Sequence, residues 1–249
     1  MSEISGLLAL WLREVKVFTR EHSRVVSSVF TPILWLVVFG GGLGSSIVIQ
    51  GMDYQTFIYP GIVSMSILFT SVFFGIYIVW DRKIDFLKEV LVAPLRRSTI
   101  FMGKVIGGMT DSMIQGTIVL LLGPLIGIGY TPLILLKAYI VVFVMAAGLV
   151  SLGLVIGSQM ESPEGFGMVV SFVVYPLFFL SGALFPIDNL PTWLGYFVLL
   201  DPLTYGVDAL RGAMLGTSRF PYLLDLGVIT AFAAFMIALG TQAFKRMKT

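Results

Sequence analysis

Six long apolar segments divide the sequence, and each is long enough to cross a bilayer as a helix. A membrane-spanning helix needs about 20 predominantly apolar residues. The apolar runs are continuous and show no alternation with a period of two, so they indicate helices rather than the strands of a β-barrel. The predicted spans are residues 25–49, 57–80, 100–127, 134–157, 165–186 and 222–244.

The segment 2–22, before the first span, carries apolar and charged residues at helical spacing. Its apolar side would be formed by Ile4, Leu7, Leu8, Trp11, Val15 and Phe18, and its charged side by Arg13, Glu14, Lys16 and Arg20. This pattern predicts an amphipathic helix that lies in the membrane interface. The alternative is an ordinary helix packed on a partner.

The segment 81–97, between the second and third spans, is dense in charge. Ile84, Leu87 and Leu91 follow helical spacing, and Pro94 would end the helix, so a short amphipathic helix is predicted over 81–93. Such a helix can be a passive interfacial connector, or it can seat its apolar residues in the groove of a soluble partner. Its mixture of acidic and basic residues favours a protein partner, because attraction to anionic lipid alone would favour bases.

Composition and charge agree with a membrane protein. Apolar residues make up 57% of the 249 residues, charged residues 12%, and the mean hydropathy is +0.96, whereas soluble domains are about 25% charged. Thirteen of the 16 basic residues fall on one side of the predicted spans, which predicts that this side and both termini are cytoplasmic. The thirteen are Arg13, Lys16, Arg20, Arg24, Arg82, Lys83, Lys88, Arg96, Arg97, Lys104, Lys245, Arg246 and Lys248.

Two regions carry a family resemblance. The run from Asp81 to Lys104, with its Asp-Arg, Phe-Leu-Lys-Glu-Val-Leu-Val-Ala-Pro, Arg-Arg-Ser and Gly-Lys elements, resembles the loop between spans two and three of ABC-2 type transporter permeases. The segments 179–186, 190–194 and 201–211 are similar to the branch that contains daunorubicin-type drug exporters and nodulation-factor exporters. The resemblance covers essentially the whole chain. Where related permeases have Asn-Pro before the Leu-Thr-Tyr run, this chain has Asp201-Pro202.

The resemblance implies a fold and a set of partners. The fold class is an all-α integral membrane protein, in which residues 1–249 form one domain with six transmembrane helices and the N-terminal amphipathic helix. A separate ABC ATPase subunit, in two copies, would bind ATP and Mg, and a second permease subunit, identical or paralogous, would complete the pathway. The chain itself lacks the G-x-x-x-x-G-K-[ST] phosphate loop, so no cofactor is expected on it.

The resemblance also assigns candidate sites at both membrane faces. The coupling segment 81–97 would contact the ATPase through Asp81, Arg82, Asp85, Phe86, Leu87, Lys88, Glu89, Leu91 and Pro94. Short external re-entrant helices over 184–215 would lie between spans five and six, in agreement with the prolines that divide this segment. They could gate the exit or only cap it, through Gly182, Phe185, Pro186, Leu190, Pro191 and Pro202.

Five other polar or aromatic positions within or near the spans lead to separate expectations. Trp35 sits deep in the first predicted span and could line the pathway or pack on a neighbouring helix. Asp111 is expected to face the bundle interior, either in a structural hydrogen bond or lining the pathway, since ionisable groups inside spans are often functional. Lys104 is expected to reach the interface with its amine in water. Asp208 and Arg211 are three residues apart on a predicted helix and could pair.

The sequence offers no metal-binding set, no catalytic nucleophile with its base and no nucleic-acid footprint. The function expected is therefore that of a non-enzymatic permease subunit in the cell membrane, in contact with membrane lipid. It would export an amphipathic substrate, such as a drug, a lipid or a lipid-linked glycan, by alternating access. An ion-coupled secondary transporter, which should show paired charges inside the spans, is one alternative. A non-transporting membrane scaffold is another.

Overall fold

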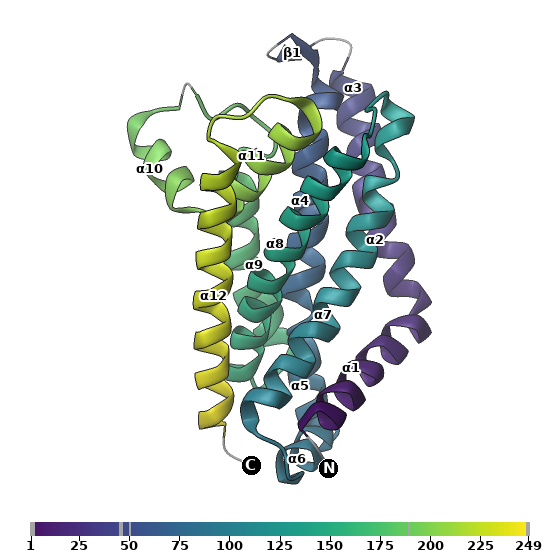
Figure 1. The fold of residues 1–249 in the computed structure, drawn as a ribbon, viewed down its shortest axis with the longest axis vertical. Coiled ribbons are helices and arrows are strands. Elements are labelled where there is room, and N and C mark those ends of the chain that lie inside the picture. The colour runs from purple at the N-terminus through teal and green to yellow at the C-terminus, as the bar shows by residue number, and fades with distance from the viewer. Residues whose placement is uncertain (1–2, 45–46, 50, 189, 248–249) are drawn as a thin grey trace.

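The computed structural model describes residues 3–44, 47–49, 51–188 and 190–247, and it shows long helices standing side by side in one bundle (Figure 1). Two strands of two residues each, β1 (Val48–Ile49) and β2 (Met52–Asp53), pair as an antiparallel hairpin. The helices are α1 (Glu3–Arg20), α2 (His22–Trp35), π-helical η1 (Leu36–Gly40), α3 (Gly41–Leu43), α4 (Tyr54–Phe73), α5 (Ile76–Lys83), α6 (Phe86–Val92), α7 (Arg97–Leu120), 3₁₀-helical η2 (Gly123–Ile126), α8 (Pro132–Gln159), α9 (Pro163–Leu180), α10 (Thr192–Leu200), α11 (Pro202–Leu215) and α12 (Tyr222–Arg246).

Within the described residues, five helices are long and apolar enough to cross a bilayer. They are Tyr54–Lys83, Arg97–Ile126, Pro132–Gln159, Pro163–Leu180 and Tyr222–Arg246. The sequence predicted each of them to within a few residues, except at one end. The span predicted over 165–186 stops at Leu180, because the chain turns at Gly182, whose φ of +70° favours glycine.

The prediction that the first span covers 25–49 is wrong at its outer end. The chain is helical from α2 through η1 to α3, and the apolar part of this helix is the short stretch Phe30–Gly40. Val48 and Ile49, placed inside the span by their hydropathy, instead pair with Met52 and Asp53 in the hairpin. The π-helical turn η1 lies before the point where the chain leaves this helix for the hairpin. A π-helical turn is a local irregularity of an α-helix.

The single helix predicted over 81–93 is also wrong. α5 ends at Lys83, and Asp85 adopts a left-handed conformation with φ 59° that a continuous helix does not contain. α6 then starts at Phe86 and ends at Val92, where the following residue is extended before Pro94. The segment is therefore two helices joined by a bend.

The bundle has two different ends. Both termini and α6 lie at one end, and the hairpin, α10 and α11 lie at the other (Figure 1). The centre is held by α4 and α8, whose apolar windows are mostly buried, whereas only 22% of the corresponding window is buried in α9 and in α12. Close contact at the centre depends on glycine: a Cβ on Gly153 would lie 2.3 Å from the carbonyl oxygen of Val72, and one on Gly75 would lie 2.0 Å from that of Gly153.

Candidate functional site

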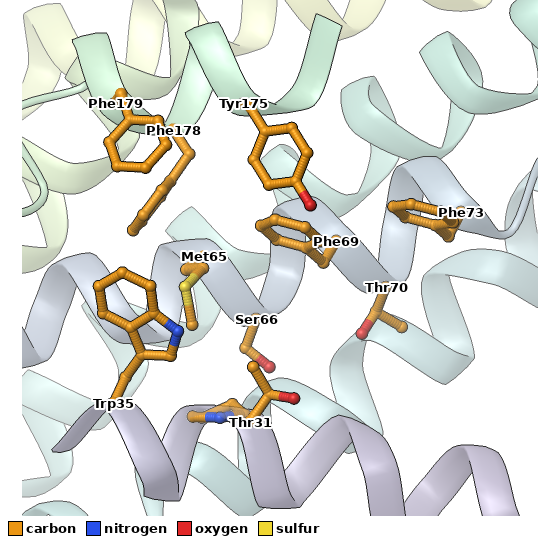
Figure 2. Close-up of a pocket in the computed structure, with 11 residues that line it drawn as sticks. Thr31, Trp35, Met65, Ser66, Phe69, Thr70, Phe73, Tyr175, Phe178 and Phe179 are labelled. Atoms are coloured by element: carbon orange, nitrogen blue, oxygen red, sulfur yellow. The ribbon is translucent and has the colours of Figure 1, made fainter. Parts of the chain in front are cut away.

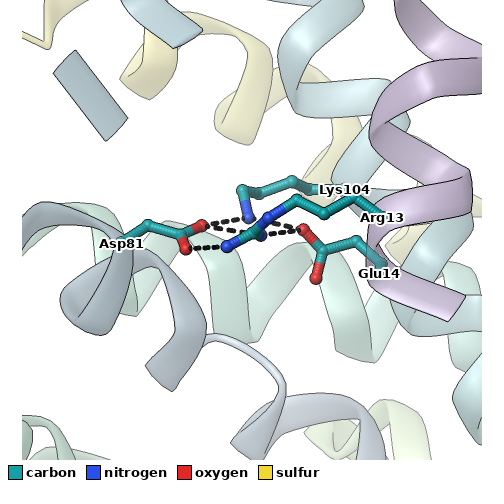
Figure 3. Close-up of polar contacts among 4 residues, drawn as sticks. All are labelled: Arg13, Glu14, Asp81 and Lys104. Atoms are coloured by element: carbon teal, nitrogen blue, oxygen red, sulfur yellow. Dashed lines mark hydrogen bonds and ion pairs between the residues drawn. The ribbon is translucent and has the colours of Figure 1, made fainter. Parts of the chain in front are cut away.

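Four charged side chains form a buried cluster just above α6. Arg13 and Glu14 come from α1, Asp81 from α5 and Lys104 from α7 (Figure 3). The amine Nζ of Lys104 lies 2.5 Å from Asp81 Oδ2 and 2.9 Å from Glu14 Oε1. The guanidinium of Arg13 lies 2.6 Å from Asp81 Oδ1 and 2.8 Å from Glu14 Oε1. Cations and carboxylates thus alternate in a closed ring, called the charge cluster below.

The charge cluster is electrically neutral and almost closed to water. The side chains of Glu14, Asp81 and Lys104 are at most 3% exposed, and that of Arg13 is 27% exposed. Burial lowers the pKa of Arg13, but the fields and hydrogen bonds of Asp81 and Glu14 outweigh this effect and raise the pKa above its usual value. Loss of one partner from such a group leaves an uncompensated buried charge.

Small residues allow α1 to lie close enough to α7 to build this cluster. A Cβ on Gly103 would lie 2.9 Å from Leu10 Cβ, and one on Gly107 would lie 2.7 Å from Glu14 Cβ. The indole Nε1 of Trp11 also donates a hydrogen bond of 3.0 Å to Thr110 on α7. The two glycines, four residues apart, therefore form a groove on α7 that receives one face of α1.

This packing corrects two expectations about charge. The buried face of α1 contains Gly6, Leu10, Glu14 and Phe18, so Glu14 does not belong to the solvated side of the helix. Lys104 does not reach water at the interface either, because it is fully buried between two carboxylates. The exposed strip Ile4, Leu8 and Leu12 remains as an apolar surface along α1.

α6 and the segments on either side of it are held beneath the charge cluster by several contacts. The Arg13 guanidinium stacks on the Phe86 ring, with its Cζ 4.0 Å from the ring centroid. The guanidinium of Arg82, next to the bend, donates hydrogen bonds of 2.9 and 2.7 Å to the carbonyl oxygens of Ser158 and Met160 at the end of α8. Glu3 of α1 accepts hydrogen bonds from the Thr99 hydroxyl and from the Arg96 backbone N–H.

The predicted coupling residues divide into an inner and an outer group. Asp81, Leu87 and Leu91 are buried in the chain, while Arg82 and Phe86 are partly buried. The outer group, exposed on the surface, is Asp85, Lys88, Glu89 and Pro94. Lys88 Nζ pairs with Asp85 Oδ1 at 2.7 Å on this surface.

The apolar face predicted from helical spacing is also split by the bend. Ile84 is 65% exposed, while Leu87 and Leu91, its predicted companions, pack into the bundle. Val92 is 74% exposed and was not among the predicted contact residues. The helical spacing over 81–93 did not indicate that Val92 is exposed, because the bend at Asp85 changes which side of α6 faces outward.

The six predicted outer residues gather around α10 and α11 at the other end. Gly182 forms the turn after α9, and its carbonyl oxygen accepts a hydrogen bond of 2.9 Å from Arg211 Nη2. Pro202 starts α11, which Asp201 caps by accepting a hydrogen bond of 2.8 Å from the Leu203 N–H. Phe185, Pro186, Leu190 and Pro191 lie in the connection between α9 and α10.

The pair expected between Asp208 and Arg211 does not form. The Asp208 carboxylate accepts hydrogen bonds from the backbone N–H groups of Arg219 and Phe220, at 2.8–3.0 Å. The Arg211 guanidinium instead stacks on the Phe57 ring, 4.2 Å from its centroid. The two side chains therefore hold different parts of the chain.

The two candidate pathway residues lie apart. Trp35 lines an aromatic cavity of about 450 Å³ between α2, α4 and α9 (Figure 2). The other residues around it are Thr31, Pro32, Met65, Ser66, Phe69, Thr70, Phe73, Tyr175, Phe178 and Phe179. Asp111 lies on α7, is 1% exposed and does not line this cavity. Among the described residues, no group of His, Asp and Glu side chains is arranged to hold a metal ion.

Several long apolar helices standing side by side around a tightly packed centre define a multi-pass helical membrane protein. The family profile described as ABC-2 type transporter matches residues 5–215, and the chain belongs to this family. The resemblance inferred from the two motifs is thus confirmed. Membership implies an ABC transporter system with an ATPase partner.

The chain is similar over most of its length to several relatives, two of which are named as transport permeases. The chain is 30% identical over 238 residues to the inner membrane transport permease YadH of Escherichia coli K12, covering 91% of this chain and 90% of that one. It is 26% identical over 244 residues to nodulation protein J of Rhizobium leguminosarum bv. viciae, covering 96% and 93%. It is 29% identical over 213 residues to the putative transport permease ycf38 of Cyanophora paradoxa, covering 84% and 73%. The chain is accordingly a membrane transport permease.

Proposed function

We propose that the chain is the membrane subunit of an ATP-driven exporter, and that α6 receives the movement of a separate ATPase that binds ATP and Mg. The charge cluster carries this proposal, because it ties α1, α5 and α7 together directly above α6. A displacement of α6 is then passed to three helices at once rather than absorbed in a loose loop. The exposed Asp85, Lys88 and Glu89 supply the surface that the ATPase would contact.

The proposed topology has six spans, with the helix that begins at α2 as the first and with α1 in the membrane interface. Both termini and α6 share one end of the bundle, and the excess of basic residues supports a cytoplasmic location for this end. The membrane would then be the inner or plasma membrane of the cell. α10 and α11 then form the external re-entrant region. The exposed Trp193 and Tyr196 of α10 suit a membrane–water interface, and this region would gate or cap the exit.

The proposed assembly contains two permease subunits, identical or paralogous, and two ATPase subunits. The proposed substrate is amphipathic, such as a drug, a lipid or a lipid-linked glycan. The aromatic cavity supports this class, because aromatic rings form most of its wall while the hydroxyl groups of Thr31, Ser66 and Thr70 provide a few polar contacts (Figure 2). Trp35 stacks on Phe39 at 4.5 Å and lies edge-on to Phe178 at 5.8 Å, so neighbouring rings orient Trp35 in the wall.

The test is to purify the chain with its ATPase and to measure ATP hydrolysis and transport in proteoliposomes. Asp85 is a poor site for substitution, because a longer side chain at φ 59° adds backbone strain. The double substitution Lys88→Glu with Glu89→Lys reverses the sign of two exposed charges on α6 and leaves the net charge unchanged. We expect normal membrane insertion with loss of coupled hydrolysis and transport.

Lys245→Asp is the matched control, since Lys245 is an exposed charge near the end of α12, at the same end of the bundle. This variant should transport normally. Full coupling in the α6 double variant, with the ATPase still bound, would contradict the proposed role of α6.

A further inference from the structure

A second cavity lies at the outer end of the bundle, among α4, α11 and the turns that flank α10 and α11. Its volume is about 360 Å³, enough for a small headgroup. The residues that line it are Phe57, Pro186, Ile187, Asp188, Asp208, Arg211, Gly216, Thr217, Ser218 and Arg219. Two guanidinium groups therefore face a space of headgroup size.

Arg211 is a buried cation with few partners. The residue is 5% exposed, and its guanidinium stacks on Phe57 with one flat side. Within the described part of the chain it donates one hydrogen bond, to the Gly182 carbonyl oxygen, although a guanidinium has five N–H donors. Its Nε has no hydrogen-bond partner there. Burial lowers the pKa of Arg211 to about 10, even though Asp208 and Asp188 act to raise it.

The acids near Arg211 do not use up its donors. Both carboxylate oxygens of Asp208 accept hydrogen bonds from backbone N–H groups of Arg219 and Phe220. Asp188 is half-exposed at the rim, with its carboxylate 4.0 Å from Arg219 Nε. Arg219 itself donates a hydrogen bond of 2.7 Å to the Ile187 carbonyl oxygen. Each guanidinium is thus held chiefly by a neutral carbonyl group.

We propose that this cavity binds an oxyanion headgroup, a phosphate or a carboxylate, between Arg211 and Arg219. A guanidinium stacked on an aromatic ring keeps its in-plane N–H groups for such an anion, and charge-assisted hydrogen bonds are about twice as strong as those to a neutral acceptor. The anion would reach the cavity past Arg219, whose side chain is 37% exposed. Binding needs no ATPase, so it is separable from the proposed export activity.

The site would also act on the turn between α9 and α10. Arg211 and Arg219 hold the carbonyl groups of Gly182 and Ile187, which are both in this turn. An anion bound between the two guanidinium groups would share the donors that fix the turn. Occupancy of the cavity is therefore linked to the segment proposed to gate the outer exit.

The test uses the intact purified chain in detergent and two probes, dioctanoyl phosphatidylglycerol and inorganic phosphate, with binding measured from ligand-dependent shifts of thermal unfolding. The first probe represents a lipid headgroup and the second a free anion. We expect at least one to bind, and Arg211→Gln to weaken its binding about tenfold or more, as expected for loss of a charge-assisted hydrogen bond. Arg219→Gln, a change at a partly exposed residue, should act in the same direction even if the Arg211 variant folds poorly.

Lys137→Gln is the matched control. Lys137 lies in the second turn of α8, and its amine lies 5.6 Å from the centroid of the Tyr222 ring, so the variant also removes a cation placed over an aromatic ring, but outside the cavity. Its affinity should stay within about twofold of wild type, which is the scatter expected for distant sites. The proposal is overturned if neither probe binds, or if all three variants weaken binding equally.

Discussion

Replacement of Lys104 by methionine should destabilise the chain strongly, because it removes the cation that two buried carboxylates share. Methionine is apolar and close to the length of the lysine stem, so the change mainly deletes charge. Asp81 and Glu14 would then face the single guanidinium of Arg13, and the charge cluster would become net negative. Breaking one side of a buried ion pair costs about 3–5 kcal/mol, a large share of a total stability of about 5–15 kcal/mol.

Lys88→Met is the matched control for this prediction. Lys88 also pairs with an aspartate, Asp85, at 2.7 Å, but the two side chains are 62% and 69% exposed. Exposed pairs contribute about 0–1 kcal/mol, so the control should lose little. Both variants would be compared by chemical denaturation in mild detergent, followed by circular dichroism. An equal loss of unfolding free energy in the two variants would refute the conclusion that the charge cluster stabilises the chain strongly because it is buried.

A second substitution tests the charge balance itself. Glu14→Gln, added to Lys104→Met, leaves Arg13 paired with Asp81 alone, at 2.6 Å, and makes the cluster neutral again. The double variant should be more stable than Lys104→Met by about 1 kcal/mol or more, within the range of coupling energies for residues in contact. A double variant that is less stable than Lys104→Met would contradict the balance of charges inferred here.

Two further predictions concern Asp201 and Gly153. Burial raises the pKa of Asp201 from 3.8 to about 8 in the folded chain, so its contribution to stability is complete below about pH 4 and is lost as the pH rises through 8. Asp201→Asn keeps a cap for α11 and should remove this pH dependence, measured as thermal unfolding between pH 5 and 9; an unchanged pH profile would rule Asp201 out as its source. Gly153→Ala should cost about 1–3 kcal/mol because its Cβ would lie 2.3 Å from the Val72 carbonyl oxygen, whereas Gly227→Ala on α12, with no atom within 4 Å, should not destabilise.

The sequence predicted well those features that depend on local composition. Span lengths follow from the width of the bilayer, and each of the five described helices long enough to cross it was predicted. Features decided by contacts between distant segments were missed. Lys104 lies 90 residues from Glu14 and 23 from Asp81, so no local pattern could show that its partners are acids inside the bundle rather than water.

The errors near α6 have one local cause. Asp85 permits the left-handed conformation more readily than most residues, yet nothing in the apolar spacing of 81–93 signals that it adopts it. Once the bend is made, Ile84 leaves the face that it shared with Leu87 and Leu91. Prediction of the exposed surface therefore depended on a single backbone torsion.

The contacts above α6 also define how far a movement of α6 can travel. α5 holds Asp81 of the charge cluster and follows α4 with a short bend at Gly75, where the backbone meets that of Gly153 on α8. Backbone-to-backbone contact leaves no side chain that could change rotamer and absorb a displacement. A displacement of α6 would therefore pass through α5 to the central pair α4 and α8, and less directly to α9, of whose apolar window 22% is buried. Since the aromatic cavity lies between α2, α4 and α9, its width would change when α4 moves further than α9.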